Sequence, residues 1–440
     1  MPVRPFRVVS LLVATALIAT GCDAFKSNKE KLPGERISVL ALEKPIEPDP
    51  DLASLEIALP RPETNQNWPQ PGGLPSHDMG HPDLPDQLSV KWSTEIGEGA
   101  SRYAQLLDGP VVNDGIVYTM DSKSLVSAWS AADGKKLWQT DITPEDNDSQ
   151  AWGGGISFDG GQVFATSGYG QVLALDAKDG SIKWRVPAGS PLRGAPTVAE
   201  GRVFVITVDN QLQALSTEDG HRLWSYDAIP ESAEFAGSAS PAIEGNAVIA
   251  SFSSGEVVAL RVENGRVLWT DSLSATRRFD AMSTLADIRG RPVIDRGRVY
   301  VISHSGRMAA IDARNGNRVW EQDVGGIYSP WIAGDFIYVL SNSNELVCLT
   351  RADGRVRWMT QLDSWQDMED KSGPLHWSGP LLAGDRLIAV GSNGQVWSVS
   401  PYTGDVLGHI ELPAGSFLPP IVADNTLYLM TNDAELSALR

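Results

Sequence analysis

Cysteine is scarce in this sequence of 440 residues, which contains only Cys22 and Cys348. There is no adjacent cysteine pair, and the six histidines are too scattered to form a cysteine–histidine cluster with zinc spacing. These absences exclude a disulfide-stabilised scaffold and a structural zinc domain. The sequence predicts no metal site and no bound cofactor.

Positive charge is also in short supply, with 36 Lys and Arg residues against 55 Asp and Glu residues and a formal net charge of −19. A surface this acidic argues against nucleic acid and anionic lipid head groups as partners. The motifs of serine hydrolases and of phosphate-binding loops are missing as well. We therefore expect a protein that is not an enzyme and has no catalytic residues.

The apolar run at residues 8–18 is too short to span a bilayer comfortably, and it follows a basic start, as in a secretory signal peptide. It leads into Ala19-Thr20-Gly21-Cys22, which resembles the lipobox of bacterial lipoproteins. The resemblance implies removal of residues 1–21 and acylation of Cys22 by palmitate and other chains, which gives a lasting membrane anchor. The alternative is an ordinary cleaved signal peptide followed by a chance cysteine.

Residues 22–87 join the lipidated cysteine to a segment with eleven prolines between positions 26 and 87. Such a segment cannot build a core of its own, so we expect a periplasmic tether ahead of the folded domain. His77 and His81 have the spacing of helical metal ligands, but the Gly and Pro residues around them favour a surface loop. Several apolar side chains predict that part of the tether packs on the domain: Leu52, Leu55, Ile57, Leu59 and Trp68.

From residue 88 onward one pattern recurs, and residues 174–184 show it as Ala-Leu-Asp-Ala-Lys-Asp-Gly-Ser-Ile-Lys-Trp. One strand ends at Ala174, the Asp-Gly pair makes a hairpin turn, and a second strand carries Trp184. The small residue that ends the first strand returns every 38 to 51 residues, at Ala128, Ala174, Ala214, Ala259, Ala310, Cys348, Ser398 and Ala438. Because Cys348 stands where other units have alanine, it is expected to be a buried core residue and not a nucleophile.

Units of this length with four short strands each are typical of β-propeller blades. We predict an all-β fold over residues 88–440, an eight-bladed β-propeller of four-stranded antiparallel blades. The eighth unit stops before its turn, so the N-terminal strand at residues 88–94 is expected to complete it and close the ring. Two carboxylates facing each other across the central channel remain an open alternative as a cation site.

Large aromatic rings at one position of the repeat are expected to wedge each blade against the next. These rings are Trp92, Trp138, Trp184, Trp224, Trp269, Trp320 and Trp358. Gly408 takes the corresponding position in one further unit. A role in stacking against a ligand is the alternative interpretation of the tryptophans.

Long loops interrupt the repeat at residues 228–240, 272–290 and 363–377. The second loop mixes Arg277 and Arg278 with apolar residues, and such a mixture is typical of protein-binding surfaces. The alternative is that each loop is simply solvated.

The Ala-x-Asp-x-x-(Asp/Asn)-Gly-x-x-x-Trp repeat resembles the tryptophan-docking repeat of quinoprotein dehydrogenases and their relatives. With the lipobox and eight units, the chain is similar to the BamB family, the propeller lipoproteins of the outer-membrane β-barrel assembly machinery. The resemblance implies a scaffold on the periplasmic side of the outer membrane that docks on the periplasmic domains of the barrel-inserting subunit. It also implies other lipoproteins of the complex and unfolded outer-membrane proteins as partners. Asp23 departs from the usual sorting pattern and leaves retention at the inner membrane open.

The resemblance implies two neighbouring docking loops. The first corresponds to Phe235, Ala236 and Gly237, where alanine replaces the arginine of the family pattern. The second corresponds to Asp287 and Arg289, where arginine replaces the second of two acidic residues. We therefore expect the charge pairing with the partner to differ from that of the family.

Two other functions remain alternatives. A quinoprotein (PQQ-dependent) dehydrogenase would need a quinone site in the channel, commonly with an adjacent cysteine pair, a calcium site and a catalytic aspartate. An interaction module for another partner in the cell envelope, such as peptidoglycan or a secretion machine, would need none of these.

Overall fold

The computed structural model of the chain describes residues 46–145, 151–231, 237, 239–274 and 287–440. Residues Ile46–Arg440 form one compact unit, which includes the proline-rich segment before residue 88. Within the described residues the helical structure is a single 3-10 turn, η3 (Pro50–Leu52), and no helix there is long and apolar enough to cross a membrane. The predicted all-β class is confirmed.

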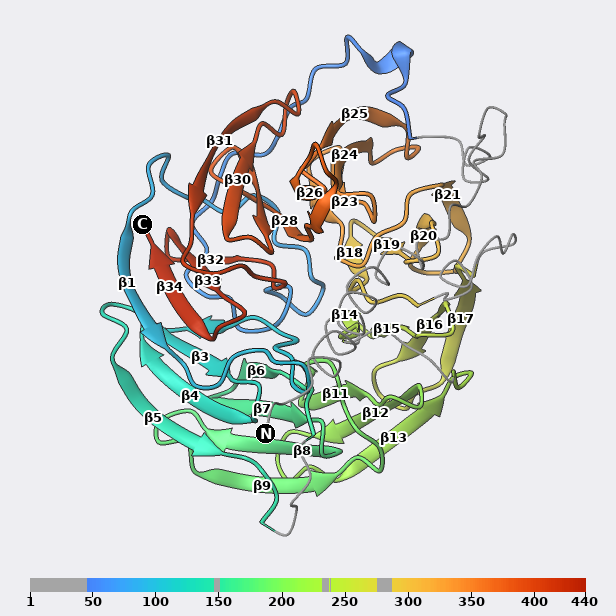
Figure 1. Cartoon of the computed structure of the whole chain (residues 1–440). Coiled ribbons are helices and arrows are strands. Elements are labelled where there is room, and N and C mark those ends of the chain that lie inside the picture. Colours follow the sequence, from blue (N-terminus) through green and yellow to red (C-terminus); the bar gives the residue numbers. More distant parts are fainter. Residues whose placement is uncertain (1–45, 146–150, 232–236, 238, 275–286) are drawn as a thin grey trace, which may run out of the picture. The chain divides into compact units, whose positions relative to one another are not determined.

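Strands β2 to β25 and β28 to β34, together with β1, form eight four-stranded antiparallel sheets, the blades of a propeller (Figure 1). Blades 1 and 2 consist of β2 (Val111–Asn113), β3 (Ile116–Met120), β4 (Leu125–Ser130), β5 (Lys136–Asp141), β6 (Ile156–Asp159), β7 (Gln162–Ser167), β8 (Gln171–Asp176) and β9 (Ile182–Pro187). Blades 3 and 4 consist of β10 (Thr197–Ala199), β11 (Arg202–Ile206), β12 (Gln211–Ser216), β13 (Arg222–Asp227), β14 (Ala242–Glu244), β15 (Ala247–Ser251), β16 (Glu256–Arg261) and β17 (Val267–Ser272).

Blades 5 and 6 consist of β18 (Val293–Asp295), β19 (Arg298–Ile302), β20 (Met308–Asp312), β21 (Arg318–Gln322), β22 (Trp331–Ala333), β23 (Phe336–Leu340), β24 (Glu345–Thr350) and β25 (Val356–Gln361). A separate hairpin of β26 (Trp365–Asp367) and β27 (Ser372–Pro374) precedes blade 7, which consists of β28 (Trp377–Ala383), β29 (Arg386–Gly391), β30 (Gln395–Val399) and β31 (Val406–Glu411). Blade 8 consists of β32 (Ile421–Ala423), β33 (Thr426–Met430), β34 (Glu435–Leu439) and β1 (Val90–Glu95).

The two ends of the propeller meet in blade 8. Strand β1 pairs antiparallel with β34, and the hydroxyl oxygens of Ser93 and Ser437 lie 2.8 Å apart across the pair. The Arg440 backbone N–H donates to the Ser89 carbonyl at 3.0 Å and extends the pairing by one step. The predicted closure of the ring by the N-terminal strand is confirmed.

A row of three residues crosses the outer strands of most blades in the same register. In blade 1 Tyr118 lies opposite Ala128, which lies opposite Trp138, and the two aromatic centroids are 6.0 Å apart across the alanine. In blade 6 the row is Tyr338, Cys348 and Trp358, with centroids 5.9 Å apart. The middle residue must be small because two rings close over it. This explains the alanine or cysteine of the repeat, which the structure places two residues before the end of its strand in blades 1 and 6 and not at the end as expected. Cys348 is buried as predicted.

The last ring of each row reaches into the following blade. The Trp138 indole N–H donates to the Ala177 carbonyl of blade 2 at 2.9 Å, and its ring covers Gly180, where an added Cβ would lie 2.4 Å from the indole. The same indole-to-carbonyl bond is made by Trp92, Trp184, Trp224, Trp269, Trp320 and Trp358. Seven of the eight junctions therefore share one contact, which uses the turn glycine of the repeat.

Between blades 7 and 8 this contact is missing. Gly408 occupies the tryptophan position of β31, and an added Cβ would meet nothing within 4 Å. Blade 8 has no turn between its third and fourth strands, because its fourth strand is β1. An indole at position 408 would therefore have no turn to pack on.

The proline-rich segment is part of the propeller. Residues 65–82, here named the inner belt, run once around the first strands of the blades and bond to them in ring order. The bonds to blades 8, 1, 2 and 3 join Asp424 N–H to Asn65 O (2.7 Å), Val112 N–H to Trp68 O (2.8 Å), Phe158 N–H to Pro69 O (2.7 Å) and Val198 N–H to Gln70 Oε1 (2.8 Å). Those to blades 4, 5, 6 and 7 join Ile243 N–H to Pro75 O (2.7 Å), Ile294 N–H to Ser76 O (2.9 Å), Trp331 Nε1–H to Gly80 O (2.8 Å) and Gly384 N–H to Pro82 O (3.0 Å).

The belt changes two expectations about the segment before residue 88. Packing on the domain is confirmed for Leu52, Ile57 and Trp68, which are buried, whereas Leu55 remains 39% exposed. The surface loop expected around His77 and His81 is wrong, because both imidazoles are buried. His77 Nδ1 bonds the Pro292 carbonyl at 2.8 Å and so links the segment to blade 5. His81 Nδ1 bonds the Pro60 carbonyl at 2.8 Å, within the segment.

Candidate functional site

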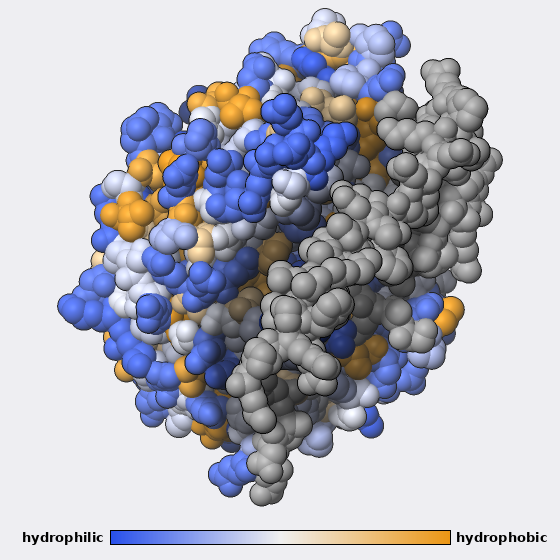
Figure 2. Space-filling model, in the orientation of Figure 1, coloured by the Kyte–Doolittle hydropathy of each residue, from blue (hydrophilic) through white to orange (hydrophobic). Residues whose placement is uncertain are grey.

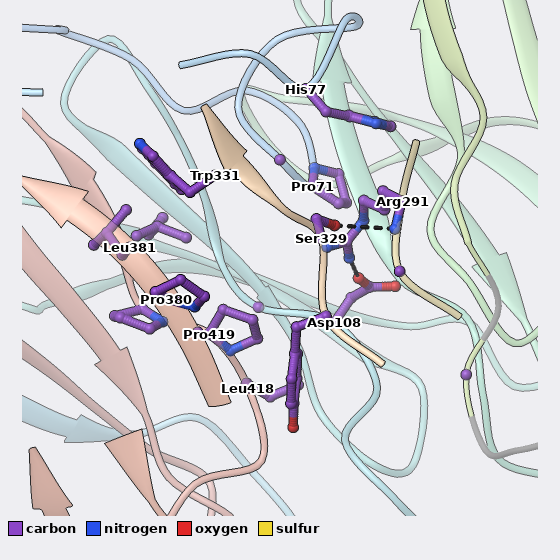
Figure 3. A pocket seen from close by; sticks show the side chains of 18 of the residues that line it. Pro71, His77, Asp108, Arg291, Ser329, Trp331, Pro380, Leu381, Leu418 and Pro419 are labelled. Atoms are coloured by element: carbon purple, nitrogen blue, oxygen red, sulfur yellow. Dashed lines mark hydrogen bonds and ion pairs between the residues drawn. The ribbon is translucent and has the colours of Figure 1, made fainter. Parts of the chain in front are cut away.

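A recess of about 990 Å³, counting the part open to solvent, lies where the first strands of several blades begin (Figure 3). One side is formed by the inner belt, through Trp68, Pro71 and His77. The other walls come from Gly-Pro and Pro-Pro steps, namely Gly109-Pro110 and Pro419-Pro420 just before their inner strands and Gly379-Pro380 within β28. Rigid proline rings at these positions make the wall apolar and fix its shape.

An ion pair crosses this recess between opposite sides of the ring. Asp108 precedes the first strand of blade 1, Arg291 precedes that of blade 5, and an Nη atom of Arg291 contacts the Asp108 carboxylate (Figure 3). The other Asp108 oxygen accepts the backbone N–H of Ala195 at 2.8 Å. Burial raises the pKa of Asp108, and the Arg291 guanidinium partly offsets that rise. The carboxylate is thus engaged on both oxygens.

A second arginine lines the recess in a different way. The Arg289 guanidinium carbon lies 6.0 Å from the ring centroid of Tyr328, which is a cation–π arrangement. Gly237 lies against the same guanidinium, and an added Cβ there would come within 2.7 Å of Arg289 Nε. Gly237 has a φ of +104°, so both its backbone conformation and its close approach require glycine.

His77 places a buried imidazole on the belt side of the recess. Its Nδ1 carries the proton that the Pro292 carbonyl accepts, and its Nε2 is buried without a hydrogen-bond partner among the described residues. Burial, assisted by the charge of Arg291, lowers the pKa of His77 to about 3. The imidazole is therefore neutral at physiological pH.

The structure brings together parts of both predicted docking loops. Gly237, from the first, touches Arg289, from the second, and both line the recess. Asp287 lies two positions before Arg289, is 4% exposed, and its backbone carbonyl accepts the His304 N–H at 3.0 Å. Four predicted docking residues fall outside the described residues: Phe235, Ala236, Arg277 and Arg278. Cys22 lies outside them as well.

Sequence reasoning missed the recess and its cross-ring ion pair. Asp108 and Arg291 are 183 positions apart and belong to no shared motif. The available signal was the proline that opens an inner strand, since Pro110 and Pro292 follow shortly after the two charged residues. In the described part of the chain, no group of three or more His, Cys, Asp or Glu side chains is arranged to hold a metal ion.

The chain resembles known proteins in sequence and in fold. It is 29% identical over 353 residues to an outer membrane protein assembly factor BamB of Salmonella typhimurium, covering 79% of this chain and 88% of that relative. The BamB of Yersinia pestis is 28% identical over 353 residues, covering 79% and 87%. The crystal structure of BamB from Moraxella catarrhalis superposes with a TM-score of 0.69 at 20% identity, covering 80% of this chain and 100% of that one.

The propeller fold is also shared with enzymes. The quinohemoprotein alcohol dehydrogenase of Comamonas testosteroni superposes with a TM-score of 0.66 at 14% identity, covering 85% of this chain and 80% of that one. At this identity the likeness concerns the fold alone. The family model described as outer membrane protein assembly factor BamB matches residues 122–360, more than half of the sequence. The chain therefore belongs to the BamB family of outer membrane protein assembly factors.

Proposed function

We propose that the protein is a non-enzymatic scaffold of outer-membrane β-barrel assembly, held at the membrane by a lipid on Cys22. It docks on the periplasmic domains of the barrel-inserting subunit and aids the insertion of outer-membrane proteins. The family match over residues 122–360 carries this proposal, because the relatives it describes are assembly factors.

The meeting of Gly237 and Arg289 beside the recess supports a docking site there. The two predicted loops would act as one surface, with the glycine giving room to the arginine. A scaffold of this kind needs no reacting groups, and the one buried carboxylate of the recess is already bonded to Arg291 and Ala195.

The test is co-purification from detergent-solubilised envelopes, using the full chain with a C-terminal affinity tag. We expect the barrel-inserting subunit to co-purify with the wild type and to be depleted with Arg289→Glu, since that change reverses the charge at the shared surface. Arg314→Glu is the matched control, because the Arg314 side chain is 87% exposed on a blade turn. If the subunit is absent from the wild-type eluate, the proposal is wrong.

The membrane attachment is tested separately. Labelled palmitate is expected to enter the wild type and not Cys22→Ala, and density-gradient separation of the envelopes should place the wild type with the outer membrane. Recovery with the inner membrane would instead indicate that Asp23 governs sorting. Addition of pyrroloquinoline quinone and calcium should leave the absorbance unchanged and permit no dye reduction with alcohols.

A further inference from the structure

We infer that Arg289 is a receptor for a carboxylate, and that the recess beside it accepts the apolar residue next to that carboxylate on a partner polypeptide. The inference rests on the proposed docking function and specifies the chemistry that the site recognises. It concerns an Asp or Glu side chain in an exposed segment of the partner.

The two arginines of the recess differ in what their charges face. Arg291 is neutralised within the chain, because its guanidinium contacts the buried Asp108 carboxylate. Among the described residues, Arg289 makes neither a hydrogen bond nor an ion pair; its guanidinium lies over the ring of Tyr328, and its charge also acts on Asp108, whose carboxylate is already bonded to Arg291. The recess thus carries one guanidinium charge beyond what its own carboxylate balances.

The position of Arg289 suits recognition of a planar anion. A cation–π contact with an aromatic face uses none of the guanidinium N–H groups as hydrogen-bond donors, so they remain available to donate to a ligand. Those N–H groups form a fork that matches the two oxygens of a carboxylate. Gly237 gives the guanidinium room, because a Cβ at that position would lie 2.7 Å from Arg289 Nε.

The surroundings make an unpaired charge costly, which favours a partner carboxylate. Arg289 is partly buried, and the walls around it are aromatic and proline rings, including Tyr328, Phe417 and Pro419. A charge in such a place is stabilised when an opposite charge joins it and the remaining apolar surface is covered.

The lining of the recess favours a polypeptide segment over a free inorganic anion. Its proline and aromatic lining offers apolar contact that an inorganic anion cannot use. An acidic residue with an apolar neighbour would use both the charge of Arg289 and the apolar lining, since the carboxylate reaches Arg289 and the apolar side chain packs between the rings.

The test uses two acetylated tripeptide amides, Leu-Asp-Leu and Leu-Asn-Leu, which differ in one charged group. Binding to the purified full chain is measured by saturation-transfer NMR at low and high salt. We expect the Asp peptide to bind about tenfold more tightly than the Asn peptide at low salt, as for a hydrogen bond to a charged group, and to lose this advantage at high salt. Equal binding of the two peptides, or no binding of either, overturns the inference.

Variants assign the effect to Arg289. Arg289→Gln should abolish the preference for the Asp peptide, Arg289→Lys should retain part of it, and the control Arg314→Gln should leave it unchanged. Thermal unfolding of each variant identifies loss of folding, and the Lys variant preserves the test if the Gln variant is unstable. A preference that survives in Arg289→Gln refutes the assignment. The peptide result is separate from co-purification, so a failure of the proposed function and a failure of this inference are distinguishable.

Discussion

At the scale of single residues, two neighbours in the inner belt have opposite protonation behaviour. Burial holds the pKa of His77 at about 3, below its ordinary value, and burial raises the pKa of Asp78 to about 6, above its ordinary value. Native His77 therefore resists protonation, while native Asp78 resists losing its proton. Their effects on stability oppose each other between about pH 4 and pH 6.

The sign for each residue follows from which state holds more protons. Between pH 3 and pH 6.5 the unfolded chain protonates His77 and the native chain does not, so this residue makes stability fall on acidification. Between pH 4 and pH 6 the native chain keeps the Asp78 proton that the unfolded chain has lost, so this residue makes stability rise on acidification.

Asp78→Asn is therefore expected to steepen the loss of stability in acid. Only the effect of His77 then remains, and the free energy of unfolding should fall on acidification by at most about 1.4 kcal/mol per pH unit from this residue. Urea unfolding at pH 4, 5, 6 and 7 measures the free energy of unfolding, and Asp86→Asn, whose side chain is 95% exposed, is the control. If the free energy of unfolding varies with pH in the same way in Asp78→Asn and wild type, burial does not raise the pKa of Asp78 as described.

At the scale of elements, the blade is built around one cross-strand row and one contact to the next blade. Trp358 stands at the end of its row, 5% exposed, and its indole N–H donates to the Pro401 carbonyl at 3.0 Å. Apolar side chains on outer strands remain partly exposed, and they appear as scattered orange groups on an otherwise polar face in Figure 2. The indole at the end of the row is thus a buried link between neighbouring blades, whereas these outer side chains stay partly in solvent.

Substitutions at Trp358 separate the hydrogen bond from the packing. Trp358→Phe removes the N–H but keeps a ring, and should lower the free energy of unfolding by about 1 kcal/mol. Trp358→Ala also leaves a cavity and should cost about 3–5 kcal/mol. Leu407→Ala, at a side chain 59% exposed on β31, should change stability little. Equal costs for the Phe and Ala variants would assign the whole effect to the hydrogen bond.

Gly408 provides the converse case. Gly408→Trp restores the repeat in sequence, but blade 8 offers no turn for the indole, and the backbone φ of +157° is one that side-chain-bearing residues rarely adopt. We expect this variant to be less stable than the wild type by roughly 1 kcal/mol or more, as for a strained backbone position. Gly408→Ala measures the backbone part alone. A rise in melting temperature for Gly408→Trp would show that the junction does accept a ring.

The blades were predictable from sequence because their determinants are local. The small residue, turn glycine and tryptophan lie within 11 positions in residues 174–184, and the pattern recurs along the chain. The inner belt was not predictable, since its bonds are mainly backbone bonds to distant strands, such as Pro75 to Ile243, and carry no side-chain signature. The recess depends on an ion pair between Asp108 and Arg291, which are 183 positions apart. Neither residue belongs to the repeated pattern, so the repeat gives no sign that the two side chains meet.

At the scale of the whole molecule, the inner belt joins all eight blades in addition to the contacts between neighbours. The first strand of each blade has a free edge toward the channel, and buried backbone groups on such an edge need partners. The belt supplies them for one amide of the first strand in each of blades 1 to 5, and in blades 6, 7 and 8 it bonds the Trp331 indole and the turn residues Gly384 and Asp424. The segment that resembles a tether in composition is thus a part of the folded unit.

Gln70 gives the sharpest test of the inner belt's role, because its side-chain amide, and not its backbone, bonds the first strand of blade 3 and can therefore be removed by substitution. Its Nε2 donates to the Val198 carbonyl and its Oε1 accepts the Val198 N–H, both at 2.8 Å and in a buried site. Gln70→Ala leaves the Val198 N–H and carbonyl unpaired, and each unpaired group should lower the free energy of unfolding by about 1–3 kcal/mol. Gln70→Glu keeps the acceptor, so it should protect the Val198 amide more than alanine does.

Amide hydrogen exchange measures the outcome at the first strands themselves. Faster exchange at Val198 in Gln70→Ala, with Val112 and Ile243 unaffected, would mean that the belt acts blade by blade. Faster exchange at all three would mean that the belt holds the ring as a single cooperative unit, and we expect this second result because the belt is one continuous segment that bonds to consecutive blades. Unchanged exchange at Val198 would contradict any role of the belt in covering the channel edge.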